Sequence, residues 1–206
     1  MKQAQFITLM SESLGVEEKT IRMIVRILRE AGLFTTGARG VNAPDITPLD
    51  AVRVIIAVVA SPSPSRAVRD VKYFGALKPD RRDEEATSAW GLPWVDENKT
   101  LEDTLLDCLS NQVPYHEISF GMLHLSEQGK AYIATDTGSQ DYHQREQWQA
   151  VMDEYAASND RPRNKDVLEA WESMRRISNT KVNRSAEIPL AELHQIGFEI
   201  IGWEVD

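Results

Sequence analysis

The sequence predicts an α+β protein with an all-α module over residues 1–82, a linker over 83–99 and an acidic α+β module over 100–206. Apolar residues recur every three or four positions up to about residue 74, which is typical of helices. Residues 117–135 instead hold two alternating apolar runs, which favour a β-hairpin. The charge also divides the chain: residues 1–82 carry thirteen Lys and Arg against eight Asp and Glu, and residues 83–206 carry ten against twenty-four. A basic module joined to an acidic one is the simplest interpretation.

The N-terminal module is expected to hold four helices. The first two cover about residues 2–13 and 17–31, and Gly32 can end the second in a left-handed cap. Residues 33–46 contain two glycines and a proline, which suit a short hairpin or an extended loop. Thr47 is then a good N-cap for a helix that reaches about Val59. The prolines of residues 60–65 end that helix, and Ser65 can cap a fourth one through about Phe74.

The C-terminal module is expected to mix helices and strands. Thr100 and Asp103 have the spacing of a capping box for a helix over residues 101–111. After the hairpin, residues 144–157 and 165–177 have helical patterns. Residues 184–193 suggest a strand and a short helix, and residues 197–205 a last strand.

The predicted helix from Thr47 to Val59 is apolar on nearly every side, and a small module has too little core to enclose it. Either the C-terminal module or a second subunit should cover it. A homo-oligomer, most simply a dimer, is expected, with burial within the chain as the alternative.

Residues 11–24 have the features of a helix-turn-helix. Ser11 is small enough for close helix contact, Gly15 suits a left-handed turn, and Ile21 and Ile24 face inward from the second helix. With the "LREAGLF" that ends this helix, residues 5–45 resemble the winged helix-turn-helix domains of bacterial and phage regulators. The resemblance implies that the second helix enters the major groove of double-stranded DNA and that a wing contacts the backbone.

The candidate DNA-binding residues are those that helical spacing places away from the buried stripe, together with one arginine of the wing. Arg22 is the best candidate for a base contact, and Lys19, Arg26 and Arg39 could neutralise phosphates. The full set is Lys19, Thr20, Arg22, Met23, Arg26 and Arg39. Glu17 and Glu18 open the same helix, where they would either repel DNA or accept a hydrogen bond from cytosine.

The function expected from this resemblance is a bacterial or phage transcriptional regulator. A small-terminase-like phage packaging protein and a protein-interaction adaptor without DNA binding are the alternatives. In each case the acidic module could dimerise or bind a protein partner.

No enzyme, cofactor or metal site is expected. Asp136-Thr137-Gly138-Ser139 matches the active-site motif of aspartic proteases, but Asp and Gly after a strand are ordinary turn residues. The four histidines lack metal-ligand spacing, and the single cysteine, Cys108, is expected to be buried. The chain lacks a long apolar run or a signal-like start, so a cytoplasmic location without membrane contact is expected.

Overall fold

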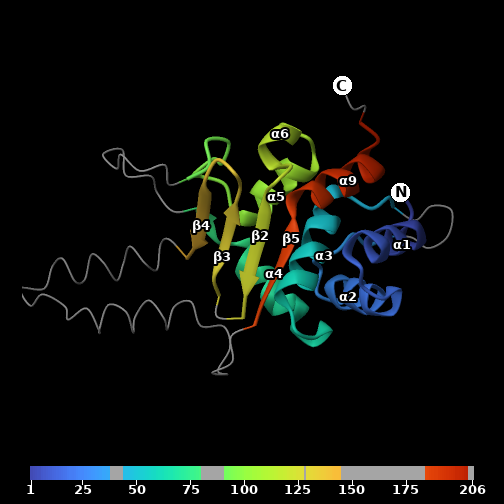
Figure 1. Cartoon of the computed structure of the whole chain (residues 1–206). Helices are drawn as coiled ribbons and strands as arrows, with labels where there is room; N and C mark the ends of the chain where they lie inside the picture. Colours follow the sequence, from blue (N-terminus) through green and yellow to red (C-terminus); the bar gives the residue numbers. More distant parts are fainter. Residues whose placement is uncertain (38–43, 80–90, 128, 145–183, 204–206) are drawn as a thin grey trace, which may run out of the picture.

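The computed structural model describes residues 1–37, 44–79, 91–127, 129–144 and 184–203. These residues combine helices with one antiparallel sheet of five strands, so the predicted α+β class is confirmed. Figure 1 shows the sheet on one side of the molecule, α3, α4 and α5 packed beside it, and α1 and α2 on the far side. Within these described ranges, no helix has the length and apolar content needed to cross a membrane.

The N-terminal helices lie close to their predicted positions. They are α1 (Gln3–Leu14), α2 (Glu18–Glu30), α3 (Pro48–Ala60) and α4 (Ala67–Gly75). Thr47 caps α3 as expected, because its hydroxyl accepts a hydrogen bond from the backbone N–H of Asp50. The expected cap at Ser65 is wrong: Pro64 starts a 3-10 turn, η2 (Pro64–Arg66), and Ser65 lies inside that turn.

Helix α3 occupies the middle of the molecule; nine of its thirteen residues are buried and the other four are half-buried. It contacts α2, α4, α5, α9 and the strands β2 and β5, so the chain itself covers this apolar helix. Of the two predicted coverings, the one within the chain is therefore observed. A dimer gains no support from α3.

The sheet has the strand order β1-β4-β3-β2-β5. The strands are β1 (Lys78–Pro79), β2 (Met122–Ser126), β3 (Ala131–Ala134), β4 (Ser139–His143) and β5 (Ser185–Pro189). The predicted hairpin is confirmed in β2 and β3, where Leu123 pairs with Ile133. The hairpin was expected to begin at residue 117, and this start is wrong. Residues 115–118 instead form a short helix, α6 (Tyr115–Ile118), with Pro114 at its N-cap.

Two further helices cover one end of the core. Helix α5 (Leu101–Leu109) starts in the predicted capping box, with the Thr100 hydroxyl 3.2 Å from the Asp103 backbone nitrogen. Helix α9 (Leu190–Ile201) follows β5 directly, so the strand predicted at 197–205 is wrong. The reason is tertiary packing: a Cβ built on Gly197 would lie only 1.8 Å from the carbonyl oxygen of Leu109, so α9 approaches the end of α5 more closely than another residue would allow.

The predicted domain boundaries at 83 and 99 remain predictions, but the residues on either side contribute to one hydrophobic core. Residues 80–90 are outside the described ranges, and Leu92 is already buried. Helix α1 contacts α9, and the backbone N–H of Leu101 donates to the Leu77 carbonyl over 2.8 Å. Residues 145–183, which hold almost all of the helices predicted at 144–157 and 165–177, also lie outside the described residues.

Candidate nucleic-acid interface

The connection between α1 and α2 contains the left-handed glycine that the sequence predicted there. Gly15 caps α1 with a φ of 62°, a left-handed conformation that favours glycine. The Ser11 hydroxyl donates to the carbonyl of Val16 over 2.6 Å, and the Val16 N–H donates to the Ser11 carbonyl over 3.1 Å. These two bonds join the last turn of α1 to the residue two positions before the start of α2.

Helix α2 has one buried face and one solvent face. Ile21, Ile24, Val25 and Leu28 are buried in the core. On the solvent face, Lys19, Arg22, Met23 and Arg26 are exposed, and Thr20 is half-buried at its edge. The structure therefore brings five of the six predicted residues together on one helix, whereas the sixth, Arg39, lies outside the described residues.

Carboxylates accompany the cations on this face. Glu18 lies 3.1 Å from the Arg22 guanidinium, and it also accepts a hydrogen bond from the Thr8 hydroxyl on α1 over 2.8 Å. Arg26 lies 3.8 Å from Glu30. These pairs are exposed and therefore weak in water. A phosphate could compete with a carboxylate for either arginine.

A buried carboxylate holds both ends of the segment that was expected to form a wing. Asp50 accepts hydrogen bonds from the backbone N–H groups of Thr35, over 2.7 Å, and Thr47, over 2.8 Å. It also accepts from both threonine hydroxyls. Thr35 and Thr47, which flank residues 36–46, are thus held together by one side chain. Residues 33–37 and 44–46 form neither helix nor strand, and residues 38–43 are outside the described ranges.

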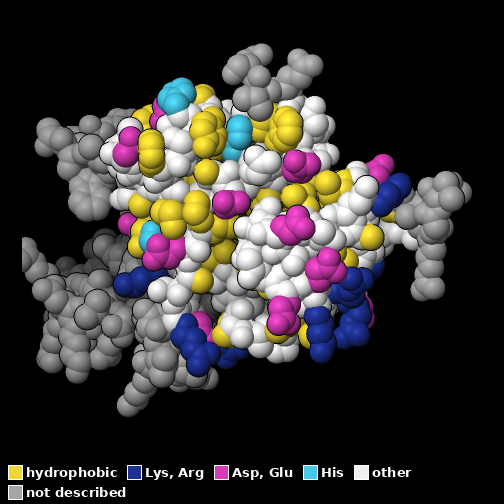
Figure 2. Space-filling model, turned by 45° about the vertical axis from the view of Figure 1, so that its right-hand side comes forward, with side chains coloured by type: hydrophobic (Ala, Val, Ile, Leu, Met, Phe, Trp, Pro, Cys, Tyr) yellow, Lys and Arg dark blue, Asp and Glu magenta, His cyan; other side chains and the backbone are white. Residues whose placement is uncertain are grey.

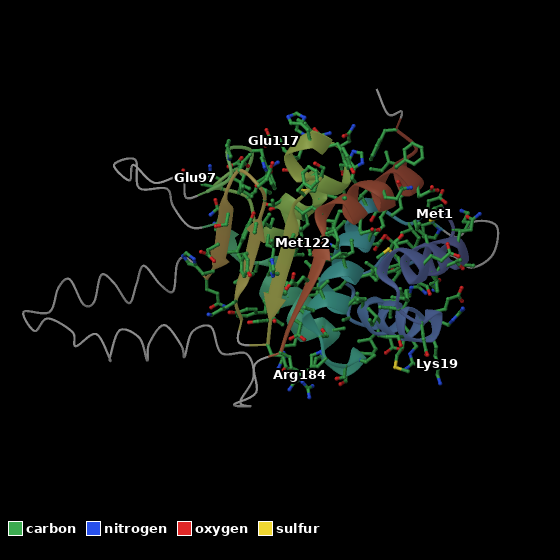
Figure 3. The ribbon with its side chains drawn as sticks, viewed as in Figure 1. Met1, Lys19, Glu97, Glu117, Met122 and Arg184 are labelled. Carbon is green, nitrogen blue, oxygen red and sulfur yellow. The ribbon has the colours of Figure 1, made fainter. Side chains whose placement is uncertain are left out.

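The fold adds cations that reasoning from the sequence missed. The turn η2 packs against α2, and its Arg66 lies 2.7 Å from Glu127 in the β2–β3 connection. The N–H of Glu127 in turn donates to the carbonyl of Arg184, at the start of β5. Figure 3 shows Lys19 and Arg184 along the same lower edge of the molecule.

This basic edge comprises exposed or half-exposed side chains from α2, η2, α4, the β2–β3 turn and the start of β5: Lys19, Arg22, Arg66, Arg69, Lys130 and Arg184. Figure 2 shows dark-blue side chains gathered along the lower part of the face in view. The excess of Lys and Arg in residues 1–82 was visible in the sequence. Their alignment with Lys130 and Arg184 depends on the tertiary fold.

The other residues considered for catalysis or metal binding lie in a turn, in the core or against another side chain. Asp136 and Gly138 lie in the turn between β3 and β4, closed by a 2.8 Å hydrogen bond from the Thr135 N–H to the Gly138 carbonyl. Cys108 is buried, and burial raises the pKa of its thiol to about 12. His124 stacks on Tyr132 with ring centroids 4.1 Å apart. Within the described ranges, His, Cys, Asp and Glu form no cluster of three or more that could hold a metal ion.

Comparison of the chain with family models, with curated proteins and with solved structures gave no match.

Proposed function

We propose that the chain binds double-stranded DNA through the outer face of α2. The observation that carries this proposal is the division of the helix: an apolar face anchors it in the core, and the opposite face presents Lys19, Arg22, Met23 and Arg26 to solvent. Arginine can bind guanine through two hydrogen bonds, and lysine can neutralise phosphate. The ordered turn at Gly15 supports the same interpretation, because it is the connection that a helix-turn-helix requires.

The basic edge supplies contacts beyond α2. Arg66, Arg69 and Arg184 extend the positive side chains past one helix, toward the phosphates that flank a groove. Arg66 is paired with Glu127 and Arg69 with Asp70, so a phosphate would share these two guanidinium groups with a carboxylate. Residues 36–46, which lie between the two threonines bound by Asp50, have the position in the chain expected of a wing. On this proposal, Glu18 holds Arg22 in the free protein and releases it when DNA binds.

DNA binding is tested by fluorescence anisotropy of the full chain with a labelled pool of random duplexes. Affinity should fall steeply between about 50 and 200 mM salt, because bound phosphates release counterions. Arg22→Ala and Arg26→Ala should each weaken binding by about 1 to 3 kcal/mol. Glu18→Gln should strengthen it, since the change removes a negative charge and frees Arg22.

The matched control is Lys99→Ala. Lys99 is also paired with a carboxylate, at 2.6 Å from Asp107, but its neighbour Glu97 lies on the opposite side of the molecule from Lys19 (Figure 3). This variant should bind DNA as the parent chain does. If no variant and no salt concentration gives duplex binding, the adaptor alternative replaces this proposal.

The biological role within DNA binding is a transcriptional regulator, with a packaging protein of the small-terminase kind as the second candidate. Oligomer size measured by light scattering distinguishes the two. A dimer favours the regulator because two-fold symmetry doubles the DNA contacts. A ring of eight or more subunits favours the packaging protein.

A further inference from the structure

A second surface lies on α6 and α9, at the opposite end of the molecule from the basic edge. Figure 3 shows Glu117 of α6 at the top, far from Lys19 and Arg184. We define the acidic-aromatic surface by six residues of these two helices and the residues that directly follow α6: Tyr115, Phe120, Glu192, Phe198, Glu199 and Ile201.

Large apolar side chains are exposed on this surface. Phe120 is 77% exposed, Tyr115 50% and Ile201 44%. Within the described ranges, Met23 of α2 is the other large apolar side chain with comparable exposure. A soluble protein that exposes several such groups together commonly uses them to bind a partner.

Helix α9 presents two different rows to solvent. His194, Phe198 and Ile201 follow one another at helical spacing beside α6, and the His194 ring lies 4.8 Å from the Tyr115 ring and 4.4 Å from the Trp203 ring. Glu192 and Glu199 lie on the other side of the solvent face, two turns apart. A partner lying along α9 would therefore meet an aromatic row and an acidic row together.

A groove continues the surface on the acidic side. It has a volume of about 830 Å³ and lies between α1 and α9, with Leu9 and Ile200 among its apolar lining residues and Glu12 and Glu199 among its acidic ones. The carboxylates of Glu12, Glu192 and Glu199 have no ion-pair partner among the described residues. They can therefore pair with an incoming cation without first losing a partner of their own.

Carboxylates predominate on the two helices of this surface. α6 and α9 contain three glutamates, Glu117, Glu192 and Glu199, and no Lys or Arg. The Met1 ammonium, at the edge of the groove, is paired with Asp45 at 3.2 Å. In Figure 2 the upper part of the molecule shows yellow, magenta and cyan side chains, and dark blue only at its right margin. Burial lowers the pKa of His194, which favours its neutral ring, so this histidine adds little positive charge at neutral pH.

We infer that the acidic-aromatic surface binds a cationic amphipathic helix of another protein. Its apolar residues would cover Phe120, Phe198 and Ile201, and its Lys or Arg side chains would face Glu192 and Glu199. Charge complementarity favours this partner over DNA or an anionic membrane, because both would meet like charge here. Burial of the aromatic side chains would supply most of the affinity, and the carboxylates would select the sign of the partner.

The test uses two labelled helical peptides with the same leucine pattern, one with lysine and one with glutamate at its polar positions. Anisotropy with the full chain should show the lysine peptide binding at least about tenfold more tightly. The double variant Phe120→Ala with Ile201→Ala should weaken that binding by about tenfold. Glu192→Gln with Glu199→Gln should weaken it by a similar factor at low salt and flatten its salt dependence.

Two control variants test whether the peptide binds at the acidic-aromatic surface. Met23→Ala removes a similarly exposed apolar side chain on α2, and Glu187→Gln removes an exposed acid on β5. Both should leave peptide binding unchanged. Equal binding of the two peptides, or equal loss in Glu187→Gln and in the α9 double variant, would overturn the inference. So would a dimer seen in sedimentation that Phe120→Ala dissociates, since the occupant would then be a second copy of the chain.

Discussion

Asp50 is the buried side chain with the most hydrogen bonds in the N-terminal half of the described chain. It is 3% exposed, and its two oxygens accept from the N–H and hydroxyl groups of Thr35 and Thr47. In Asp50→Asn, either orientation of the amide would turn its NH2 group toward a backbone N–H. We expect urea denaturation to show a loss of about 2 to 4 kcal/mol, because a buried donor is left without an acceptor.

The control for this prediction is Asp45→Asn. Asp45 is exposed, 3.2 Å from both the N-terminal amine and the Lys2 ammonium. Exposed pairs of this kind contribute little to stability, so the midpoint of its denaturation should stay close to that of the parent chain. Similar losses in the two variants would show that the buried network around Asp50 does not stabilise the fold.

The outer face of α2 could be predicted residue by residue, and part of its ion pairing as well. Helical spacing alone separates Arg22 and Arg26 from the buried Ile21 and Ile24, because the period of the helix fixes both faces. The four-residue spacing of Glu18 and Arg22 also indicates a pair. The bond from Thr8 to Glu18 could not be predicted, since it depends on how α1 crosses α2.

At the scale of the elements, Gly197 sets how closely α9 approaches α5. Gly197→Ala would place a Cβ against the backbone of Leu109, which cannot move without shifting the end of α5. Thermal or urea unfolding should show a loss of about 1 to 3 kcal/mol. Gly75→Ala, the control, places its Cβ 3.3 Å from the carboxylate of Glu102, a side-chain group that can shift more easily than a backbone carbonyl. It should have a much smaller effect, because alanine also favours the helix.

If both glycine variants cost the same, close contact between α5 and α9 would not be the cause. The outcome matters beyond these two helices, because α9 carries both rows of the acidic-aromatic surface. A shift of α9 in Gly197→Ala would also change the spacing between its side chains and those of α6.

Elements with local signals could be predicted, and those determined by tertiary contacts could not. The capping residues Thr47 and Thr100 act within one turn, so they define the starts of α3 and α5. The end of α9 contains Phe198, Ile200 and Ile201, a composition that favours a strand. Packing of Leu193, Ile196 and Gly197 against the core overrides that local preference.

For the whole molecule, the shared core leads to a prediction about the isolated N-terminal residues. α3 packs against α5, α9, β2 and β5, so a chain of residues 1–82 alone would expose apolar side chains such as Val52 and Ile56, which are fully buried in the full chain. We expect circular dichroism to show no cooperative thermal unfolding of residues 1–82. The full chain should unfold cooperatively under the same conditions. A sharp transition in the short chain would show that the N-terminal residues fold as a separate module.

The contact between α1 and α9 also affects the order in which the fold forms during synthesis. These helices are the first and the last that the structure describes, and nearly all of the described residues lie between them. During synthesis, α1 must wait until residue 201 has been made before its partner helix is complete. The apolar side chains of Leu9 in α1 and of Met1 just before it pack on the core in the folded chain, and they remain accessible to chaperones until then. The contact between α1 and α9 therefore forms late in the synthesis of these residues, after the other described helices and strands have been made.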